Sequence, residues 1–217
     1  DVAALFLIDL SASTDSRIYH EVDGDGSPVE GVGGSANLRV IDVLKEAVVV
    51  LSAALDEIGD DYAIYGFSSA GRQNVEVYPV KAFTEKLSDK TKGRISGMEP
   101  KRSTRMGAAV RHAVRKLKEV NSRAKMLVLL SDGFPEDADY GRDESAPMYG
   151  LKDTMMAFRE AERASISSFC LTVDKSGNDY LREMCSPSRY MVLNDISSLP
   201  SELPKIYQRH VRMQLSE

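Results

Sequence analysis

The sequence predicts a single α/β domain: a doubly wound, mostly parallel sheet with one antiparallel edge strand and helices on both faces. Short apolar runs such as Val2–Asp9 and Lys125–Leu130 have the length of strands that are buried on both faces. They alternate with helical segments of about 10 to 20 residues, which is the pattern of a doubly wound sheet. The 217 residues fit one such domain, and no linker or internal repeat divides them.

The individual elements follow from hydrophobic periodicity and turn signals. The clearest helix is Arg39–Gly59, whose apolar residues recur at alternating steps of three and four. The β-rich runs Tyr62–Ser69 and Asn74–Val80 flank a short turn and predict an antiparallel hairpin. The remaining predicted elements are, in chain order, the helices Phe83–Ile95 and Gly107–Val120, the strand Lys125–Leu130, the helix Leu151–Ala164, the strand Ser165–Val173, the helix Asn178–Cys185, the strand Tyr190–Leu193 and the helix Ser198–Met213.

Composition and charge exclude several classes of protein. Hydrophobic residues make up 42% and charged residues 28%, as in an ordinary globular domain. The net charge of −5 gives no basic footprint for nucleic acid. No apolar run approaches the roughly 18 residues that span a bilayer, so membrane insertion is not expected. Cys170 and Cys185 are too few for a disulfide framework and predict reduced thiols in a cytoplasmic protein. Because the chain opens at Asp1 inside a predicted strand, we expect it to be part of a longer protein.

Polar side chains follow two of the apolar runs at the point where each ends. Asp9, Ser11 and Ser13 close the first run, Asp132 follows the Lys125 run, and Ser103-Thr104 precedes the predicted helix that begins at Gly107. Doubly wound sheets bind ligands outside the carboxyl ends of their strands. If the two runs form neighbouring strands, these carboxylates and hydroxyls converge at one edge of the sheet.

All of these residues offer hard oxygen donors, without sulfur or imidazole. Such donors suit Mg²⁺, Mn²⁺ or Ca²⁺ and argue against Zn²⁺. Because hydroxyls are neutral, this shell neutralises a divalent cation only in part, and Mg²⁺ keeps water in the positions left open. The ion therefore stays electrophilic, and a carboxylate of a partner protein can take an open position.

The spacing of these residues is similar to a known family pattern, D-x-S-x-S followed by a distant Thr and a distant Asp. Asp9-Leu-Ser11-Ala-Ser13, Thr104 in RSTRMGAA and Asp132 in LLSDG meet it. The sequence strongly resembles a von Willebrand factor type A domain over nearly its whole length. The resemblance implies a metal-ion-dependent adhesion site, in which the two serines bind the metal directly and Thr104 and Asp132 bind it directly or through water. It also implies a binding domain without catalytic activity.

Longer segments resemble one bacterial subfamily, the C-terminal domains of nitric-oxide-reductase activation proteins (NorD) and rubisco activase adaptors (CbbO). These segments are DLSASTDS, RVIDVLKEA, DYAIYGFSS, STRMGAAVRHA, SDGFPEDADY and YGLKDTMMAFREA, together with the end of the strand at Thr172-Val173-Asp174. The resemblance implies one domain, residues 1–217, that recruits a target protein to a hexameric AAA+ ATPase of the MoxR class through the metal. Two departures stand out: Lys101-Arg102 replaces expected glycines, and the Asp15–Leu38 insertion is long.

Three alternatives are weighed against this interpretation. The Asp9 segment could be a polar strand end only, since Asp and Ser favour turns. A metal-dependent hydrolase or phosphatase would use Asp9 as nucleophile, but it needs a second acid where this chain has Ser11. An extracellular adhesion module is the third alternative, and the low thiol count argues against it.

Charged segments flank the predicted metal site. Residues 101–125 hold nine Lys or Arg against one Glu. Most of this charge is expected to be solvated, but Lys101, Arg102 and Arg105 lie close to Thr104, where they would attract a target that presents an Asp or Glu to the metal. Residues 132–144 hold six acids against one Arg and predict an exposed loop near the same edge. The Asp23-Gly-Asp25-Gly stretch lacks the further acids of a calcium-binding EF-hand loop.

Overall fold

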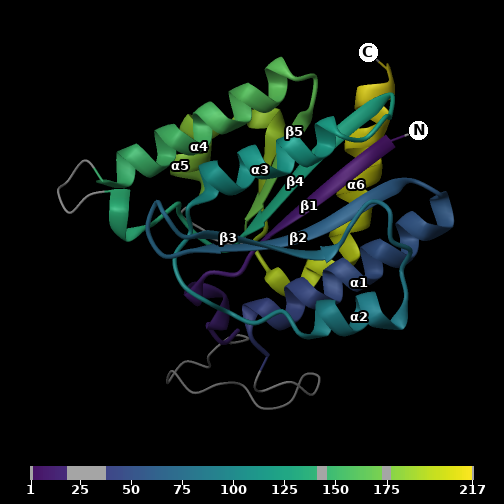
Figure 1. Cartoon of the computed structure of the whole chain (residues 1–217), viewed down its shortest axis with the longest axis horizontal. Coiled ribbons are helices and arrows are strands. Elements are labelled where there is room, and N and C mark those ends of the chain that lie inside the picture. Colours follow the sequence, from purple (N-terminus) through teal and green to yellow (C-terminus); the bar gives the residue numbers. More distant parts are fainter. Residues whose placement is uncertain (1, 19–37, 141–145, 173–176, 217) are drawn as a thin grey trace.

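Six strands form one sheet in the order β3-β2-β1-β4-β5-β6, as the computed structural model shows (Figure 1). The structure describes residues 2–18, 38–140, 146–172 and 177–216. Every neighbouring pair is parallel except β2 and β3, which form the expected hairpin at one edge. The predicted fold class is therefore confirmed. The strands are β1 (Val2–Asp9), β2 (Asp61–Ser69), β3 (Val75–Lys81), β4 (Ala124–Ser131), β5 (Ser167–Thr172) and β6 (Tyr190–Val192).

Strand β1 lies at the centre because both of its faces are apolar. All eight of its residues are buried. Alternate side chains of a strand point to opposite faces, so Phe6 and Ile8 enter one hydrophobic cluster while Leu5 and Leu7 enter the other. β1 pairs in parallel with both β2 and β4. The chain therefore reverses its winding direction between β1 and β4, which is where such sheets bind ligands.

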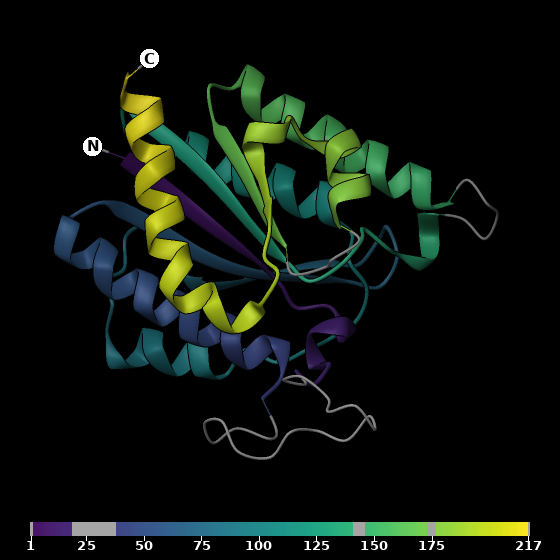
Figure 2. The same cartoon turned by 180° about the vertical axis from the view of Figure 1, so that it is seen from behind.

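The helices cover the two faces in two groups of three. α1, α2 and α6 pack on one face and α3, α4 and α5 on the other, as Figures 1 and 2 show from opposite sides. The α1 helix ends at Gly59, whose left-handed φ of 81° lets its amide bond Leu55. The helices are α1 (Val40–Ile58), α2 (Asp89–Ser96), α3 (Met106–Lys118), α4 (Ala146–Arg163), α5 (Gly177–Met184) and α6 (Leu199–Ser216), with short 3₁₀ turns η1 (Ala12–Asp15), η2 (Ala138–Tyr140), η3 (Pro187–Arg189) and η4 (Ile196–Ser198).

One predicted helix is shorter than expected. The sequence predicts a helix over Phe83–Ile95, but α2 begins only at Asp89. Ser88 is the N-cap: its backbone is extended and its hydroxyl accepts the Thr91 amide at 3.3 Å. The residues before it are held by a side chain instead, because Arg94 bonds Glu85. The other predicted elements are present, with ends displaced by a few residues.

Most of the Asp15–Leu38 insertion, including the Asp23-Gly-Asp25-Gly stretch, lies outside the described residues. Its two ends are paired: the Ile18 amide donates to the Leu38 carbonyl at 2.9 Å, and residues 17 and 39 form an antiparallel bridge. The insertion therefore leaves and returns at one point beside η1. In the part of the chain that the structure describes, no helix is long and apolar enough to cross a membrane.

Candidate metal centre

Three segments meet at the carboxyl end of the central strands. β1 and β4 are neighbours, so the residues after Asp9 and after Ser131 lie at the same edge of the sheet. The loop before α3 is bound to the segment after Asp9 by two backbone hydrogen bonds. The Lys101 amide donates to the Leu10 carbonyl and the Ala12 amide donates to the Arg102 carbonyl, both at 2.7 Å. The segment after β1 thus meets two segments that follow it by about 90 and about 120 residues in sequence. The second of these meets it because β1 and β4 are parallel neighbours, so their carboxyl ends lie together.

A chain of hydroxyl and carboxylate oxygens crosses this edge. The Oγ atoms of Ser11 and Ser13 are 3.0 Å apart, and Ser13 Oγ donates to Asp132 Oδ1 at 2.9 Å. The η1 turn makes this possible, since the Thr14 and Ser16 amides bond back to the carbonyls of Ser11 and Ser13 and tighten the loop. The predicted convergence of the Asp9 segment with Asp132 is therefore present in the structure.

Asp9 lies beneath the serines and is fully buried. Its Oδ1 accepts the Ser11 amide at 2.8 Å, and its Oδ2 accepts the Ser131 hydroxyl at 2.8 Å. Burial, and next the charge of Asp132, raise the pKa of Asp9 to about 7. The Asp9 carboxyl orients the loop, but near pH 7 it is only partly ionised, and a cation bound beside it would favour the ionised form by relieving its repulsion with Asp132.

Ser131 is a member of the cluster that sequence reasoning missed. Its hydroxyl donates to Asp9 and also lies 3.1 Å from the Gly133 carbonyl oxygen. The signal was present, because Ser131 directly precedes Asp132 at the end of a strand. It was overlooked because the family pattern specifies only the Asp.

Thr104 lies in the third segment, buried at the start of α3. Its amide donates to the Glu136 carbonyl at 2.7 Å, and the preceding Ser103 forms a two-bond bridge with Ser69 at the end of β2. These bonds hold Thr104 between the ends of β2 and β4. Its side chain takes no part in the three bonds given above for the described residues, from the Ser11 amide to Asp9, between Ser11 and Ser13, and from Ser13 to Asp132.

The donor set fits a hard divalent cation. Ligand oxygens about 2.1 Å from Mg²⁺ in an octahedral shell lie about 3.0 Å from their neighbours along an edge. The Ser11–Ser13 and Ser13–Asp132 oxygen pairs are hydrogen-bonded at 3.0 and 2.9 Å, and these separations are also compatible with neighbouring positions of such a shell. Among the described residues, no three His, Cys, Asp or Glu side chains group as metal ligands. A metal at this edge would therefore depend on serine and threonine hydroxyls together with the carboxylates.

A buried ion pair fixes the loop that carries Thr104. Arg105 Nη2 bonds Asp137 Oδ1 at 3.1 Å, and Ser69 Oγ donates to Asp137 Oδ2 at 2.6 Å. The Gly71 amide also bonds Asp137, and the Arg105 guanidinium lies 4.2 Å from the ring centre of Tyr140. Asp137 thus joins the β2–β3 hairpin, the α3 N-terminus and the segment after β4.

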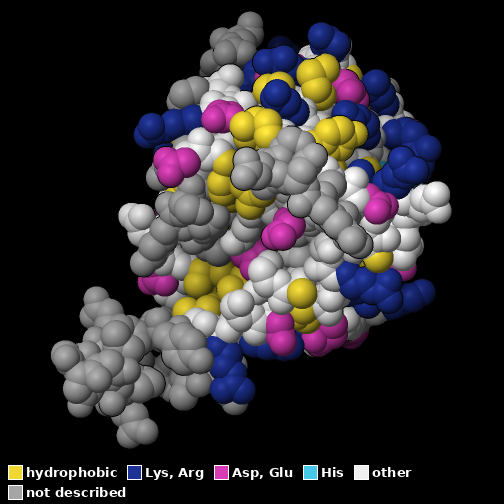
Figure 3. Space-filling model, turned by 90° about the vertical axis from the view of Figure 1, so that its left-hand side faces the viewer, with side chains coloured by type: hydrophobic (Ala, Val, Ile, Leu, Met, Phe, Trp, Pro, Cys, Tyr) yellow, Lys and Arg dark blue, Asp and Glu magenta, His cyan; other side chains and the backbone are white. Residues whose placement is uncertain are grey.

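Two expectations about charge need correction here. Arg105 was expected on an exposed basic flank, but it is 8% exposed and its charge is paired with Asp137. The acidic run 132–144 was expected to form an exposed loop, but Asp137 within it is buried. Lys101 and Arg102 are exposed as expected, with Lys101 leaning over the Tyr78 ring. Figure 3 shows this side of the molecule, where acidic side chains lie near the centre of the face and Lys and Arg side chains gather toward its margins.

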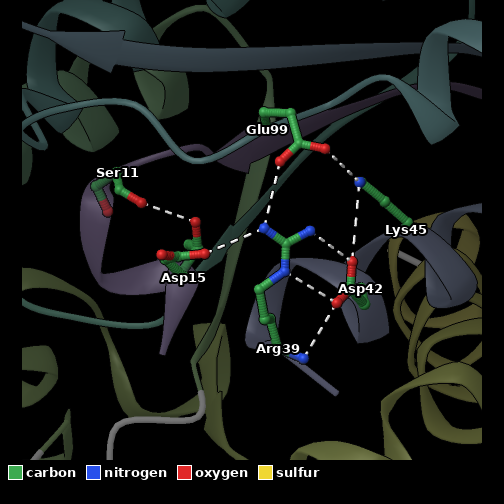
Figure 4. A network of polar contacts seen from close by, with 7 residues as sticks. Ser11, Asp15, Arg39, Asp42, Lys45 and Glu99 are labelled. Atoms are coloured by element: carbon green, nitrogen blue, oxygen red, sulfur yellow. Dashed lines mark hydrogen bonds and ion pairs between the residues drawn. The ribbon is translucent and has the colours of Figure 1, made fainter. Parts of the chain in front are cut away.

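An ion-pair network supports the outer side of the site (Figure 4). Arg39, at the start of α1, contacts Asp15 of η1 at 3.1 Å, Asp42 at 3.1 Å and Glu99 at 3.3 Å. Lys45 adds a contact to Glu99 at 3.5 Å. The hydrogen bonds from Arg39 hold the pKa of Asp42 below its usual value. The network joins three segments: the η1 turn that contains Ser13, the start of α1, and the loop that precedes Lys101.

This geometry does not suit Asp9 as a nucleophile. Its side chain is fully buried, and each of its oxygens accepts a hydrogen bond from the protein. Covalent catalysis needs an accessible nucleophile with an acid or base partner. What the arrangement offers is a set of hydroxyl and carboxylate oxygens that the fold brings together at the carboxyl end of β1 and β4.

Comparisons with known proteins agree with the sequence pattern. Residues 5–209 match the von Willebrand factor type A domain. Protein NorD of Stutzerimonas stutzeri is 36% identical over 195 residues, which cover 90% of this chain and 29% of that protein. Protein NorD of Brucella melitensis is 35% identical over 208 residues, which cover 96% of this chain and 30% of that protein. The chain therefore spans about three tenths of the length of these relatives.

Solved structures share the fold at low sequence identity. The PilB minor pilin from Streptococcus sanguinis superposes with a TM-score of 0.71 at 16% identity, covering 99% of this chain and 61% of that one. The pilus adhesin SpaC from Lactobacillus rhamnosus GG gives a TM-score of 0.63 at 13% identity, covering 94% of this chain and 30% of that one. At these identities the likeness establishes the fold alone.

Proposed function

The chain belongs to the von Willebrand factor type A domain family, and from this premise we propose that it is a non-catalytic adaptor domain that binds a partner protein through a divalent cation. The cation is Mg²⁺, with Mn²⁺ or Ca²⁺ as alternatives of similar ligand chemistry. It is held by the side chains of Asp9, Ser11, Ser13, Thr104 and Asp132.

The observation that carries the proposal is the spacing of the Ser11, Ser13 and Asp132 oxygens. They lie 3.0 and 2.9 Å apart in sequence order, at hydrogen-bonding distances that are also compatible with neighbouring ligands of one small cation. Asp9 supplies a buried negative charge beneath them, and Asp132 supplies one at the surface. With two carboxylates and neutral hydroxyls, a bound Mg²⁺ remains able to gain from one more carboxylate. We therefore expect the partner to present an Asp or Glu to the metal.

The relation to NorD proteins suggests where such an adaptor acts. The chain is 36% identical to the NorD protein of Stutzerimonas stutzeri over most of its length. On the resemblance to nitric-oxide-reductase activation proteins, we place it in an accessory protein that recruits a target, such as nitric oxide reductase, to a hexameric MoxR-class AAA+ ATPase. We place this activity in the cytoplasm, where the thiols of Cys170 and Cys185 stay reduced.

A pull-down with the purified ATPase and target as prey tests the proposal. The target is expected to bind in Mg²⁺, to be released by EDTA, and to return when Mg²⁺ is restored in excess. Replacing Thr104 or Asp132 with Ala should weaken recruitment more than folding, because both residues lie at the edge of the sheet. Ser201→Ala, on the exposed side of α6, serves as a matched control.

The target's contribution is tested in the same assay. Each surface Asp or Glu of the target is changed to its amide, and one such change is expected to reproduce the effect of EDTA, since an amide cannot replace the charge of a carboxylate ligand. Binding that ignores both the chelator and every acid-to-amide change contradicts the proposed function, even if the domain binds metal.

A further inference from the structure

A second candidate site lies away from the metal centre, on the α3, α4 and α5 face of the sheet. A cavity of about 360 Å³ opens between α4, β5 and the end of α5. Its floor includes Ser168 and Cys170 of β5, and Cys185 lines it at the end of α5. Ser168 pairs with Leu127 in the middle of β4, whereas the candidate metal centre lies beyond the end of that strand at Ser131. The cavity is within the lower part of the size range of small-molecule sites.

The floor of the cavity carries a buried polar group that faces no protein partner. The Ser168 hydroxyl oxygen is inaccessible to solvent and makes no hydrogen bond within the described part of the chain, and the residue is 4% exposed. A buried hydroxyl without a partner is costly, so such groups are normally paired with protein, water or a ligand. Ser168 therefore carries a donor without a protein partner in the described residues, at a position that lines the cavity.

Three arginines are among the residues that line the same cavity. Arg159, Arg182 and Arg189 line it, against the carboxylates of Glu162 and Glu183. Two of these residues already pair with each other, since Arg189 bonds Glu162 at 2.5 Å. The planar guanidinium matches the oxygens of carboxylates and phosphates, to which it donates two parallel hydrogen bonds. The excess of cations over anions gives the cavity the sign that suits an anion.

We propose that this cavity binds a small oxyanion, a phosphate or a carboxylate compound, whose oxygens accept hydrogen bonds from Ser168 and from Arg159 and Arg182. The apolar wall of Met155, Phe158 and Met184 leaves room for a short carbon skeleton beside the charged group. The proposal does not depend on the metal centre.

Two methionines of the cavity wall serve as reporters of occupancy. Met155 and Met184 line the cavity, and a guest there shifts their methyl resonances in a protein labelled with ¹³C at methionine methyl groups. The buried core residues Met98 and Met106 lie outside the cavity lining and serve as internal references. The probes are inorganic phosphate and succinate, titrated separately in metal-free buffer at constant ionic strength. The two arms distinguish a phosphate site from a carboxylate site.

The expected result is a saturable shift of Met155 and Met184 for at least one probe, with the references unmoved. Ser168→Ala and Arg182→Gln are each expected to weaken binding by about 5- to 10-fold, the worth of one hydrogen bond or more. Arg163→Gln, an exposed α4 change outside the cavity lining, is expected to leave it unchanged. The double variant Ser11→Ala/Ser13→Ala should also bind the probe normally, which separates this site from the metal centre.

Two results overturn the proposal. One is the absence of a saturable shift with either probe up to about 20 mM, well above the millimolar range of weak specific binding. The other is equal weakening by Arg163→Gln and Arg182→Gln, which would show a diffuse charge effect. Ser168→Ala should not lower the melting temperature of the free protein, because its hydroxyl has no partner to lose; a clear loss would show a structural role and also count against the site.

Discussion

At the scale of single residues, the most informative group is the buried Asp9 carboxylate. One of its oxygens holds the Ser11 amide and the other holds the Ser131 hydroxyl. In the proposed metal site, Ser131 therefore supports Asp9 and does not extend the row of Ser11, Ser13 and Asp132 oxygens. We assign it as a positioning residue.

Ser131→Ala is predicted to reduce metal affinity by about 10-fold, the lower end of the effects seen when groups behind metal ligands are removed. The reason is that Asp9 loses one of the two bonds that fix its orientation. Titration calorimetry with Mn²⁺ measures the change, and Ser131→Thr, which keeps the hydroxyl, is expected to recover most of it. An affinity unchanged in Ser131→Ala would show that Asp9 needs no such support.

The residue scale also shows what the sequence could predict. The rule that such sheets bind ligands at their carboxyl ends points to the Asp9 segment, Ser103-Thr104 and Asp132, and the resemblance to the von Willebrand factor type A pattern selects Thr104 and implies the ligand roles. The burial of Asp137 could not be predicted in this way, because in a run of six acids nothing local distinguishes the one that meets Arg105 and Ser69. Those partners lie 32 and 68 residues away in sequence.

At the scale of elements, Asp137 joins the β2–β3 hairpin to the start of α3. Burial works to raise the pKa of Asp137, but hydrogen bonds from Ser69, the Asp139 amide and Arg105 outweigh it. The pKa therefore lies below its usual value. A depressed pKa in the folded state means that the ionised carboxylate stabilises the fold above about pH 4, and that this stabilisation is lost as the pH falls through the folded pKa.

Asp137→Asn is therefore predicted to lower the free energy of unfolding at pH 7 by about 3 kcal/mol, because it leaves the Arg105 charge buried without its partner. The loss should shrink as the pH is lowered below about 4, where the parent protein also loses the charge. Urea unfolding at several pH values measures both effects, with Asp139→Asn as the exposed neighbouring control. A loss that stays constant down to pH 2 would contradict this account.

The elements themselves were predictable where periodicity is strong. The β1 run and the α1 stripe were placed within a residue or two, since β1 is buried on both faces and α1 packs one regularly spaced apolar stripe against the core. The α2 start was placed six residues too early, because the polar segment before it has no periodicity and only the Ser88 cap decides where the helix begins. A cap signal outweighs a weak apolar pattern in such a segment.

At the scale of the whole molecule, the exposed positive charge near the proposed metal site is smaller than the sequence indicated. Arg105 is neutralised by Asp137, which leaves Lys101 and Arg102 as the exposed cations of that segment. Exposed charges act on association rates over roughly 10 Å at physiological salt. They steer an acidic partner more than they hold it.

Reversing both charges, Lys101→Glu/Arg102→Glu, is predicted to slow association with an acidic target by roughly 10-fold at low salt and to reduce the salt dependence of the rate. The dissociation rate should change much less. Surface plasmon resonance at two salt concentrations measures this, and Lys90→Glu/Lys92→Glu on α2 gives a control with the same change in net charge. Equal slowing in both variants would show that overall charge, rather than this flank, controls the encounter.

The central claim is that the hydroxyls of Ser11 and Ser13 bind a divalent cation, and one calorimetric titration tests it most directly. Mg²⁺ and Mn²⁺ are titrated into the parent domain and into Ser11→Ala/Ser13→Ala, with the melting temperature of each recorded without metal. Removal of both hydroxyls takes away two donors but keeps the Ser11 amide bond to Asp9, so the fold should remain. The account predicts metal binding by the parent, at least a 100-fold loss of affinity in the double variant, and melting temperatures that differ little. Equal metal affinity in the two proteins would contradict it.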